Sequence, residues 1–371
     1  MGPAHRRRVV AWLAAFLAIA PSVAMGQASP PANKSAKAAK PPKKPNSKPD
    51  GVVKFFRSES PLVVTLTTNI KRLRGDKDAT APWRAATLAY TPPGAALATV
   101  PVFVKTRGIW RLKTCEFPPL RLNFTSEAVK HTDFHGLDKP KLVNYCRNED
   151  SYDQYLLQEF QLYRIYRLLT PISHAVRLMR ITYADSATGK TEATRYGFIE
   201  EEPNELAARV GARVLTTKGA TPNDLEPYQS ALVGVFQYMI GNTDFAFSAL
   251  HNAELLATKT GEFIPVVYDF DFAGAVNARY ATADPRLNIR SVRTRLYRGF
   301  CVPPDAYPKV FAQFNAKKDS IYALYRDPLG KLLAPGTADE TIKYFDEFYK
   351  IINDPRAVKD KIMDACQGKL S

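Results

Sequence analysis

The order of strand-like and helix-like segments is the feature that most constrains how this 371-residue chain can fold. The region from residue 62 to residue 124 is rich in Val, Thr, Leu and aromatic residues, in stretches that Pro and Gly interrupt. This composition is typical of strands. The stretches lie at residues 62–70, 83–90, 100–112 and 119–124. We therefore predict an antiparallel sheet in this part of the chain.

One long helix and a hairpin follow the predicted sheet. After a short strand at 141–146, residues 151–170 carry apolar side chains three and four positions apart, and Pro171 ends the pattern. This spacing is the period of an amphipathic helix. The turn-like sequence "SATGK" then joins two strands, 175–185 and 193–202. The N-terminal part is thus expected to be a sheet that carries one long helix.

Helical patterns dominate the rest of the chain. They lie at 204–209, 225–241, 305–326, 337–353 and 355–366, and a strand pair at 251–270 interrupts them. A body of about 320 residues is larger than one small core requires, so we expect two parts. The predicted class is α+β, with an antiparallel-sheet N-lobe over 51–203 and a mostly helical C-lobe over 204–371.

The first 50 residues differ from the rest in composition. Three arginines at 6–8 precede a twelve-residue apolar run and then small residues, which predicts a secretory signal peptide over 1–26. The run is too short to span a bilayer, so we expect no transmembrane span after cleavage; an uncleaved anchor is the alternative. Residues 27–50 are rich in Lys, Pro and Ala and predict a disordered tether. Its lysines, within 34–48, suit electrostatic contact with an anionic surface, and a solvated spacer is the alternative. We expect a secreted or periplasmic protein.

Net charge limits the classes of partner. The chain has a formal charge of +16, but residues 1–50 hold nine Lys and Arg against one acid, which leaves 43 basic and 35 acidic residues. A moderate positive balance favours anionic partners such as phosphates. No segment combines Arg clusters with interleaved aromatic residues, so we expect no nucleic acid partner.

The chain has four cysteines, an even number that predicts disulfides in an oxidising compartment. We favour Cys115–Cys146 and Cys301–Cys366, because each pair then stays within one half of the chain. The other pairings and free buried thiols are the alternatives. No two cysteines have the short spacing of a zinc knuckle.

Polar residues follow two apolar segments in the second half. In "GNTDFAFSALHN", Asp244 lies eight residues before Asn252, and in "YDFDFAG" Asp269 and Asp271 end an apolar strand. Carboxylate and amide oxygens are hard ligands that suit Mg or Mn, and these ions bind phosphates. Phosphoryl transfer needs such ligands together with a residue that orients the attacking hydroxyl and a cation that binds phosphate. The pattern therefore indicates a metal-dependent transferase.

Several segments, in the same order, resemble the spore-coat protein H (CotH) family of atypical secreted kinases, and more loosely the HipA-like kinases. They are "RGIWRLKTCEFPPLRLNF", "KLVNYCRNEDSYDQYLLQEFQLYRIY", "YGFIEE", "GNTDFAFSALHN" and "YDFDFAG". The resemblance implies a secreted subgroup of that family, with a two-lobed protein-kinase-like fold. It also implies ATP or another nucleotide as donor, Mg or Mn as cofactor, and transfer of a phosphoryl or nucleotidyl group to a protein or cell-envelope acceptor.

The resemblance assigns roles to the polar residues. Asp244 would orient or deprotonate the acceptor hydroxyl, while Asn252 and Asp269 would hold the metal. Asp271 competes with Asp269, because alternate residues of a strand point to opposite faces. Glu159, on the long helix, would pair with the phosphate-binding cation, and Glu201 or one of its neighbours would mark the link between the lobes. Where the family commonly has lysines after Phe-Pro, this chain has arginine, which leaves as candidate cations Arg121, Lys113, Arg107 and Lys141.

Each assignment has a structural alternative. Asp244 and Asn252 suit capping of a turn, "YDFDF" suits a half-exposed strand, and Glu159 suits a solvent-facing helix position. "HTDFH" (131–135) suits a polar loop better than a metal site, since no third ligand lies nearby. A serine hydrolase is unsupported because the chain has no Gly-x-Ser-x-Gly motif. The alternative function is a non-catalytic binding or structural module of the cell envelope.

Overall fold

The computed structural model describes residues 54–78 and 80–370. The predicted signal peptide and tether, residues 1–50, lie outside the described residues. Within the described ranges no helix is long and apolar enough to cross a membrane. The structure pairs Cys115 with Cys146 and Cys301 with Cys366, which confirms the predicted disulfides.

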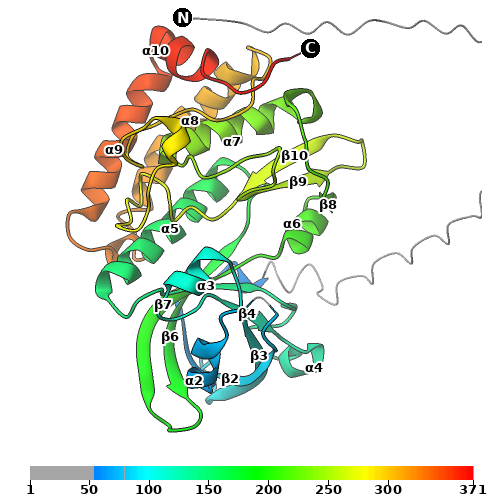
Figure 1. Ribbon diagram of the computed structural model, residues 1–371, viewed down its shortest axis with the longest axis vertical. Coiled ribbons are helices and arrows are strands. Elements are labelled where there is room, and N and C mark those ends of the chain that lie inside the picture. The colour runs from blue at the N-terminus through cyan, green and yellow to red at the C-terminus, as the bar shows by residue number, and fades with distance from the viewer. Residues whose placement is uncertain (1–53, 79, 371) are drawn as a thin grey trace, which may run out of the picture. The chain divides into compact units, whose positions relative to one another are not determined.

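Seven strands of the first part form a closed barrel with the order β1-β2-β3-β4-β5-β7-β6 (Figure 1). The strands are β1 (Leu62–Thr68), β2 (Arg84–Tyr90), β3 (Ala98–Thr106), β4 (Leu120–Asn123), β5 (Lys141–Asn144), β6 (Val176–Asp185) and β7 (Thr191–Glu200). Adjacent strands are antiparallel except β1 and β6, which run parallel with Val64 opposite Ile181. This parallel pair joins the two edges of the sheet and closes it.

Alternation of apolar and polar side chains explains the barrel. In β3, Val100, Val102 and Val104 are buried while Phe103 points outward. This is the period of two that a strand with one buried face requires. The interior is filled with large side chains, among them Phe117 and Tyr145, whose rings stack at 4.7 Å. The barrel is therefore a packed core and not a channel.

The predicted two-lobed protein-kinase-like fold was wrong. Its N-lobe would be an open antiparallel sheet, whereas this sheet is a closed barrel that contains a parallel pair. Strand patterns in a sequence are local and do not say which distant strands pair, so the closure by β1 and β6 was not foreseen. In the second half the predicted strand pair is present, and an unpredicted third strand joins it in a small sheet.

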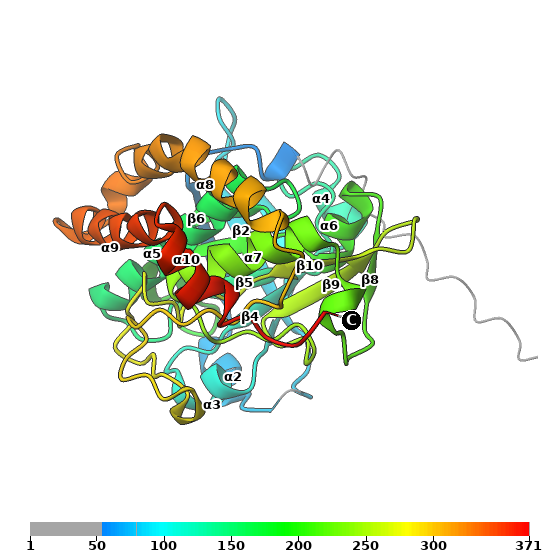
Figure 2. The same cartoon turned by 90° about the horizontal axis from the view of Figure 1, so that it is seen from above.

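Helices pack against this small sheet and against one another. The helices are α5 (Asp150–Leu169), α6 (Pro203–Arg209), α7 (Pro227–Ile240), α8 (Ala306–Ala323), α9 (Thr337–Ile352) and α10 (Pro355–Val358). The strands are β8 (Arg213–Leu215), β9 (Ala253–Ala257) and β10 (Phe263–Val267). Helix α7 packs against α8 on one side and β10 on the other (Figure 2). It ends at Gly241, which adopts the left-handed conformation that glycine favours at a helix C-terminus.

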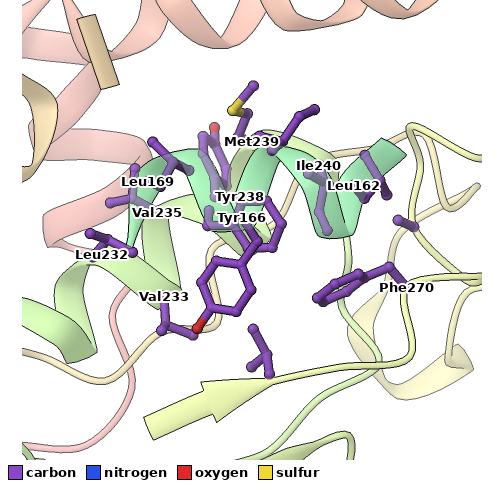
Figure 3. Close-up of a cluster of buried hydrophobic side chains, with 14 of the residues drawn as sticks. Leu162, Tyr166, Leu169, Leu232, Val233, Val235, Tyr238, Met239, Ile240 and Phe270 are labelled. Atoms are coloured by element: carbon purple, nitrogen blue, oxygen red, sulfur yellow. The ribbon is translucent and has the colours of Figure 1, made fainter. Parts of the chain in front are cut away.

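Aromatic residues join α5, α7 and the segment after β10 into one core. The rings of Tyr166 on α5 and Phe236 on α7 stack at 4.7 Å. Phe270, which follows β10, lies edge-on to Phe236 at 5.4 Å and points into the same cluster (Figure 3). The aspartates on either side of Phe270 are thereby anchored by a buried side chain.

A short helix replaces the end of one predicted strand. We expected the strand at 100–112 to be continuous, but β3 ends at Thr106 and α3 (Trp110–Thr114) follows. Gly108 between them has φ +85°, a left-handed conformation that a strand does not adopt. The helices α2 (Ile70–Gly75) and α4 (Ser126–Val129) are also short and were not predicted.

Candidate functional site

A cavity of about 560 Å³ brings most of the predicted site residues together. From the predicted set it is lined by Arg107, Lys141, Glu159, Asp244, Asn252, Asp269 and Asp271. These residues come from the barrel, from α5 and from the two polar segments that flank the β9–β10 hairpin. Residues far apart in the sequence thus face one common space.

Asp269 and Asp271 both line this cavity. The expectation that only one of them could face it was wrong, because β10 ends at Val267 and strand alternation no longer applies. Asp269 has φ +62°, a left-handed conformation that reverses the chain locally. Asp and Asn tolerate this conformation better than other non-glycine residues.

Backbone strain gathers in the same segments. Of the non-glycine residues with positive φ in the described ranges, Leu250, Asn252 and Asp269 lie in the two polar segments. Residues held in such conformations cluster at functional sites, since packing elsewhere must offset their cost. Here the support includes the Asp269 amide, which donates to the Tyr163 hydroxyl at 2.9 Å. The Phe270 amide donates to Glu159 Oε1 at 3.3 Å.

The carboxylates in the cavity repel one another. Burial and the negative charge of Asp269 raise the pKa of Asp271 to about 7, although Arg111 lies nearby and Tyr280 donates a hydrogen bond at 3.2 Å. Burial, Asp271 and Asp269 likewise raise the pKa of Glu159 well above its ordinary value. Closely placed carboxylates of this kind favour a bound cation, which would relieve the repulsion.

The donor set suits a hard divalent cation. It consists of two carboxylates and the amide oxygen of Asn252, all of them oxygen ligands. Asn252 Nδ2 donates to the backbone oxygen of Asp244 at 2.8 Å and to its Oδ2 at 3.0 Å, so Oδ1 is the atom left to bind a cation. Across residues 54–78 and 80–370 no group of three or more His, Cys, Asp or Glu side chains is arranged as a metal site. The candidate set has only two such side chains and depends on the amide for its third ligand.

Asp244 is held in a fixed orientation at the edge of the cavity. A bridge between Ala246 and His251 closes the polar loop and brings Asn252 back to Asp244. His251 Nε2 lies 2.8 Å from Asp244 Oδ1, opposite the Asn252 contact at Oδ2. The Asp244 side chain is still 42% exposed. It can therefore reach a bound substrate while two neighbours orient it.

Two arginines between β3 and β4 supply positive charge. Arg107 Nε donates to the Leu120 carbonyl at 3.2 Å, and Arg111 Nη2 donates to the Asn144 carbonyl at 2.7 Å. Burial lowers the pKa of Arg107 despite the nearby charge of Asp269. Arg111 was not predicted, although it lies four residues after Arg107, a spacing that places two side chains on one face of a strand or a helix.

Lys141 and Glu200 form the third charged group of the cavity. Lys141 Nζ lies 3.2 Å from Glu200 Oε1 and 4.1 Å from the centre of the Tyr268 ring. The sequence points to Glu201 or one of its neighbours, and Glu200 is the one that lines the cavity. Glu201 points away from the cavity and pairs with Arg209 at 2.9 Å, so its role is structural. Consecutive residues at the end of β7 face opposite sides, which explains the difference.

Two predicted cations lie outside the cavity. Arg121 is 3.6 Å from Glu202, and Lys113 is exposed on α3. Neither lines the cavity, so Arg107, Arg111 and Lys141 are the remaining candidates for binding phosphate. The "HTDFH" segment lies in turns after α4, as its polar composition suggested.

Comparisons with known proteins give no independent indication of function. A scan against protein-family models and a search of curated proteins both found no match to this chain. The cavity itself combines clustered carboxylates, half-buried cations and an oriented aspartate.

Proposed function

We propose that this protein is a secreted or periplasmic transferase that moves a phosphoryl or nucleotidyl group from ATP or another nucleotide to a protein or cell-envelope acceptor. The observation that carries the proposal is the common cavity of Asp244, Asn252, Asp269 and Asp271 with three cations. The proposal depends on this cavity and not on the overall fold. A relationship to the CotH family is part of it.

The volume and charge of the cavity suit a nucleotide with its metal. A space of about 560 Å³ lies within the range of pockets that hold small ligands. Arg107, Arg111 and Lys141 would bind the phosphates, and Arg is suited to forked contacts with phosphate oxygens. Asp269, Asp271 and Asn252 Oδ1 would hold Mg or Mn, which when bound neutralises charge on the phosphate oxygens.

Asp244 is the residue we assign to the acceptor. Its carboxylate would accept a hydrogen bond from the acceptor hydroxyl and take the proton as that oxygen forms its bond to phosphorus. In the same step the bond between this phosphorus and a bridging oxygen breaks, and the leaving group departs on that oxygen: with ATP, this is ADP in phosphoryl transfer or pyrophosphate in nucleotidyl transfer. His251 and Asn252 hold the carboxylate in position for this step.

The two disulfides support the proposed compartment. Disulfides persist in oxidising environments such as the periplasm and the cell exterior. Both pairs are formed in the structure, one of them directly after α3 and its cavity residue Arg111. A secreted or periplasmic location thus agrees with the chemistry of the cysteines.

A thermal-shift assay of the purified full-length chain tests the proposal. Nucleotide with Mg or Mn should raise the melting temperature, because a ligand at 100 times its Kd stabilises the folded state by about 2.7 kcal/mol. Label transfer should be lost in Asp244→Asn and retained in Asp305→Asn, a matched change at an exposed carboxylate. If neither nucleotide nor metal shifts the melting temperature, the protein is a non-catalytic envelope module.

A further inference from the structure

A second cavity, of about 430 Å³, opens beside the first and shares three wall residues with it. The shared residues are Asp244, His251 and Phe272. A transfer between two bound molecules requires both to reach the same group in the correct orientation. Asp244 is accessible from both cavities, so a donor in the first and an acceptor in the second would meet at its carboxylate.

Arg298 gives the second cavity a guanidinium that makes no direct ion pair among the described residues. Its side chain is half-buried, and Nη1 donates to the Thr243 carbonyl. Among the described residues no carboxylate lies within ion-pair distance of it, and Nε has no hydrogen-bond partner. Asp284 and Asp244 lie near Arg298 without forming an ion pair with it, so its guanidinium still has a donor free for a ligand.

Arg286 adds a second guanidinium at the mouth of this cavity. Its side chain is 88% exposed and lies 2.5 Å from Asp284, two residues away. Exposed ion pairs of this kind contribute little to stability, so a ligand carboxylate can compete for the arginine. Arg286 and Arg298 thus offer two donors for an anionic group of a ligand. The negative charges of Asp284 and Asp244 in the same wall limit how strongly a purely anionic ligand would bind.

The rest of the wall favours a peptide. It includes apolar side chains, among them Phe245, Ala246, Pro285 and Val292. Apolar surface beside two arginines suits the apolar and acidic side chains of a short peptide.

We propose that the second cavity binds the acceptor, a peptide segment in which a Ser or Thr hydroxyl lies close to an acidic side chain. The arginines would bind the carboxylate while the hydroxyl reaches Asp244. This inference rests on the proposed transferase function, because it assigns the acceptor of that reaction. It also makes a claim about binding that can be tested without any transfer.

The first test measures peptide binding to the full-length chain by fluorescence anisotropy, without nucleotide. A labelled peptide with Asp next to Ser should bind more tightly than the same peptide with Asn or Lys in place of Asp. Arg286→Ala should weaken binding of the acidic peptide about threefold to fivefold, as expected for an exposed ion pair. Arg290→Ala is the matched control, because Arg290 is exposed in the same loop but lines neither cavity.

The second test measures label transfer to these peptides. Arg286→Ala should raise KM for the acidic peptide and leave kcat unchanged, since the arginine contributes to binding only. Arg298→Gln should raise KM for the acidic peptide further than Arg286→Ala does. The melting temperature of Arg298→Gln shows whether this variant folds. If it does not fold, the KM of Arg286→Ala alone tests the proposal.

The two proposals fail in different ways. Equal binding of acidic, neutral and basic peptides, or equal effects of Arg286→Ala and Arg290→Ala, would overturn the acceptor assignment, while a nucleotide-dependent thermal shift would still support the transferase. Stronger competition by glycerol 3-phosphate or by anionic lipid vesicles than by the unlabelled peptide would also overturn the assignment to a peptide. Arginine-dependent peptide binding without any nucleotide effect would support the peptide site and refute the transfer.

Discussion

Asp269→Asn should make the metal-free protein more stable at high pH. The pKa of Asp271 is raised from 3.8 to about 7, first by burial and then by the charge of Asp269. An acid whose pKa is higher in the folded than in the unfolded state loses stability as pH rises from its unfolded to its folded pKa. A shift of this size corresponds to about 4 kcal/mol in the ionised state, of which Asp269 contributes the smaller share.

Asp269→Asn removes the part of this free energy that comes from the charge of Asp269. We expect Asp269→Asn to stabilise the fold by about 1–2 kcal/mol at pH 8 and to have little effect at pH 5, where Asp271 is neutral in the folded state. Asp269 also helps to raise the pKa of Glu159, so removal of its charge should stabilise the fold at pH 8 through Glu159 as well. Asn is the suitable replacement, since it tolerates the left-handed backbone at this position.

Urea unfolding of the full-length chain with a chelator present, at pH 5 and pH 8, measures this difference. The control is Asp305→Asn, an exposed carboxylate remote from the cavity, which should behave as the wild type at both pH values. Destabilisation by Asp269→Asn at pH 8, or an equal effect at both pH values, would show that the two aspartates do not repel each other in the folded protein.

Three further predictions concern residues around the cavity. His251→Ala should lower kcat and leave the nucleotide Kd unchanged, because His251 orients Asp244; kinetics and calorimetry measure the two quantities, and an equal change in both would contradict this role. Glu201→Gln should destabilise the fold by about 3–5 kcal/mol in urea unfolding, since it breaks a buried ion pair with Arg209. Nucleotide affinity should not change, because this pair lies outside the cavity. Weaker nucleotide binding at unchanged stability would refute this structural role. Replacement of Cys115 and Cys146 by Ser should cost about 3–4 kcal/mol in the same assay and weaken nucleotide binding, because the bridge anchors the end of α3 beside Arg111; unaltered affinity would separate the bridge from the site.

The sequence was sufficient to predict where most strands and helices lie. Val and Thr alternation marked β1 and β3, and the apolar spacing of 151–170 marked α5, because these signals are local. The same signals could not predict closure of the barrel. The parallel pairing of β1 with β6 depends on contacts between segments far apart in the chain.

For the candidate site, too, local sequence patterns predicted which segments are involved but not how their side chains are oriented. The polar segments around Asp244 and Asp269 stood out because polar residues interrupt apolar ones there. Which of two neighbours faces the cavity depended on backbone details that the sequence does not display. The left-handed turn at Asp269 placed both aspartates in the cavity, and the end of β7 placed Glu200 there instead of Glu201.

Calorimetric titration of the full-length chain with Mn and ATP tests the central claim most directly. The account predicts that ATP binding requires Mn and is lost when both Asp269 and Asp271 are replaced by Asn, while the double variant stays folded. Binding of ATP that is equal with and without Mn, or equal in the wild type and the double variant, would contradict the claim that these residues form one metal–nucleotide site.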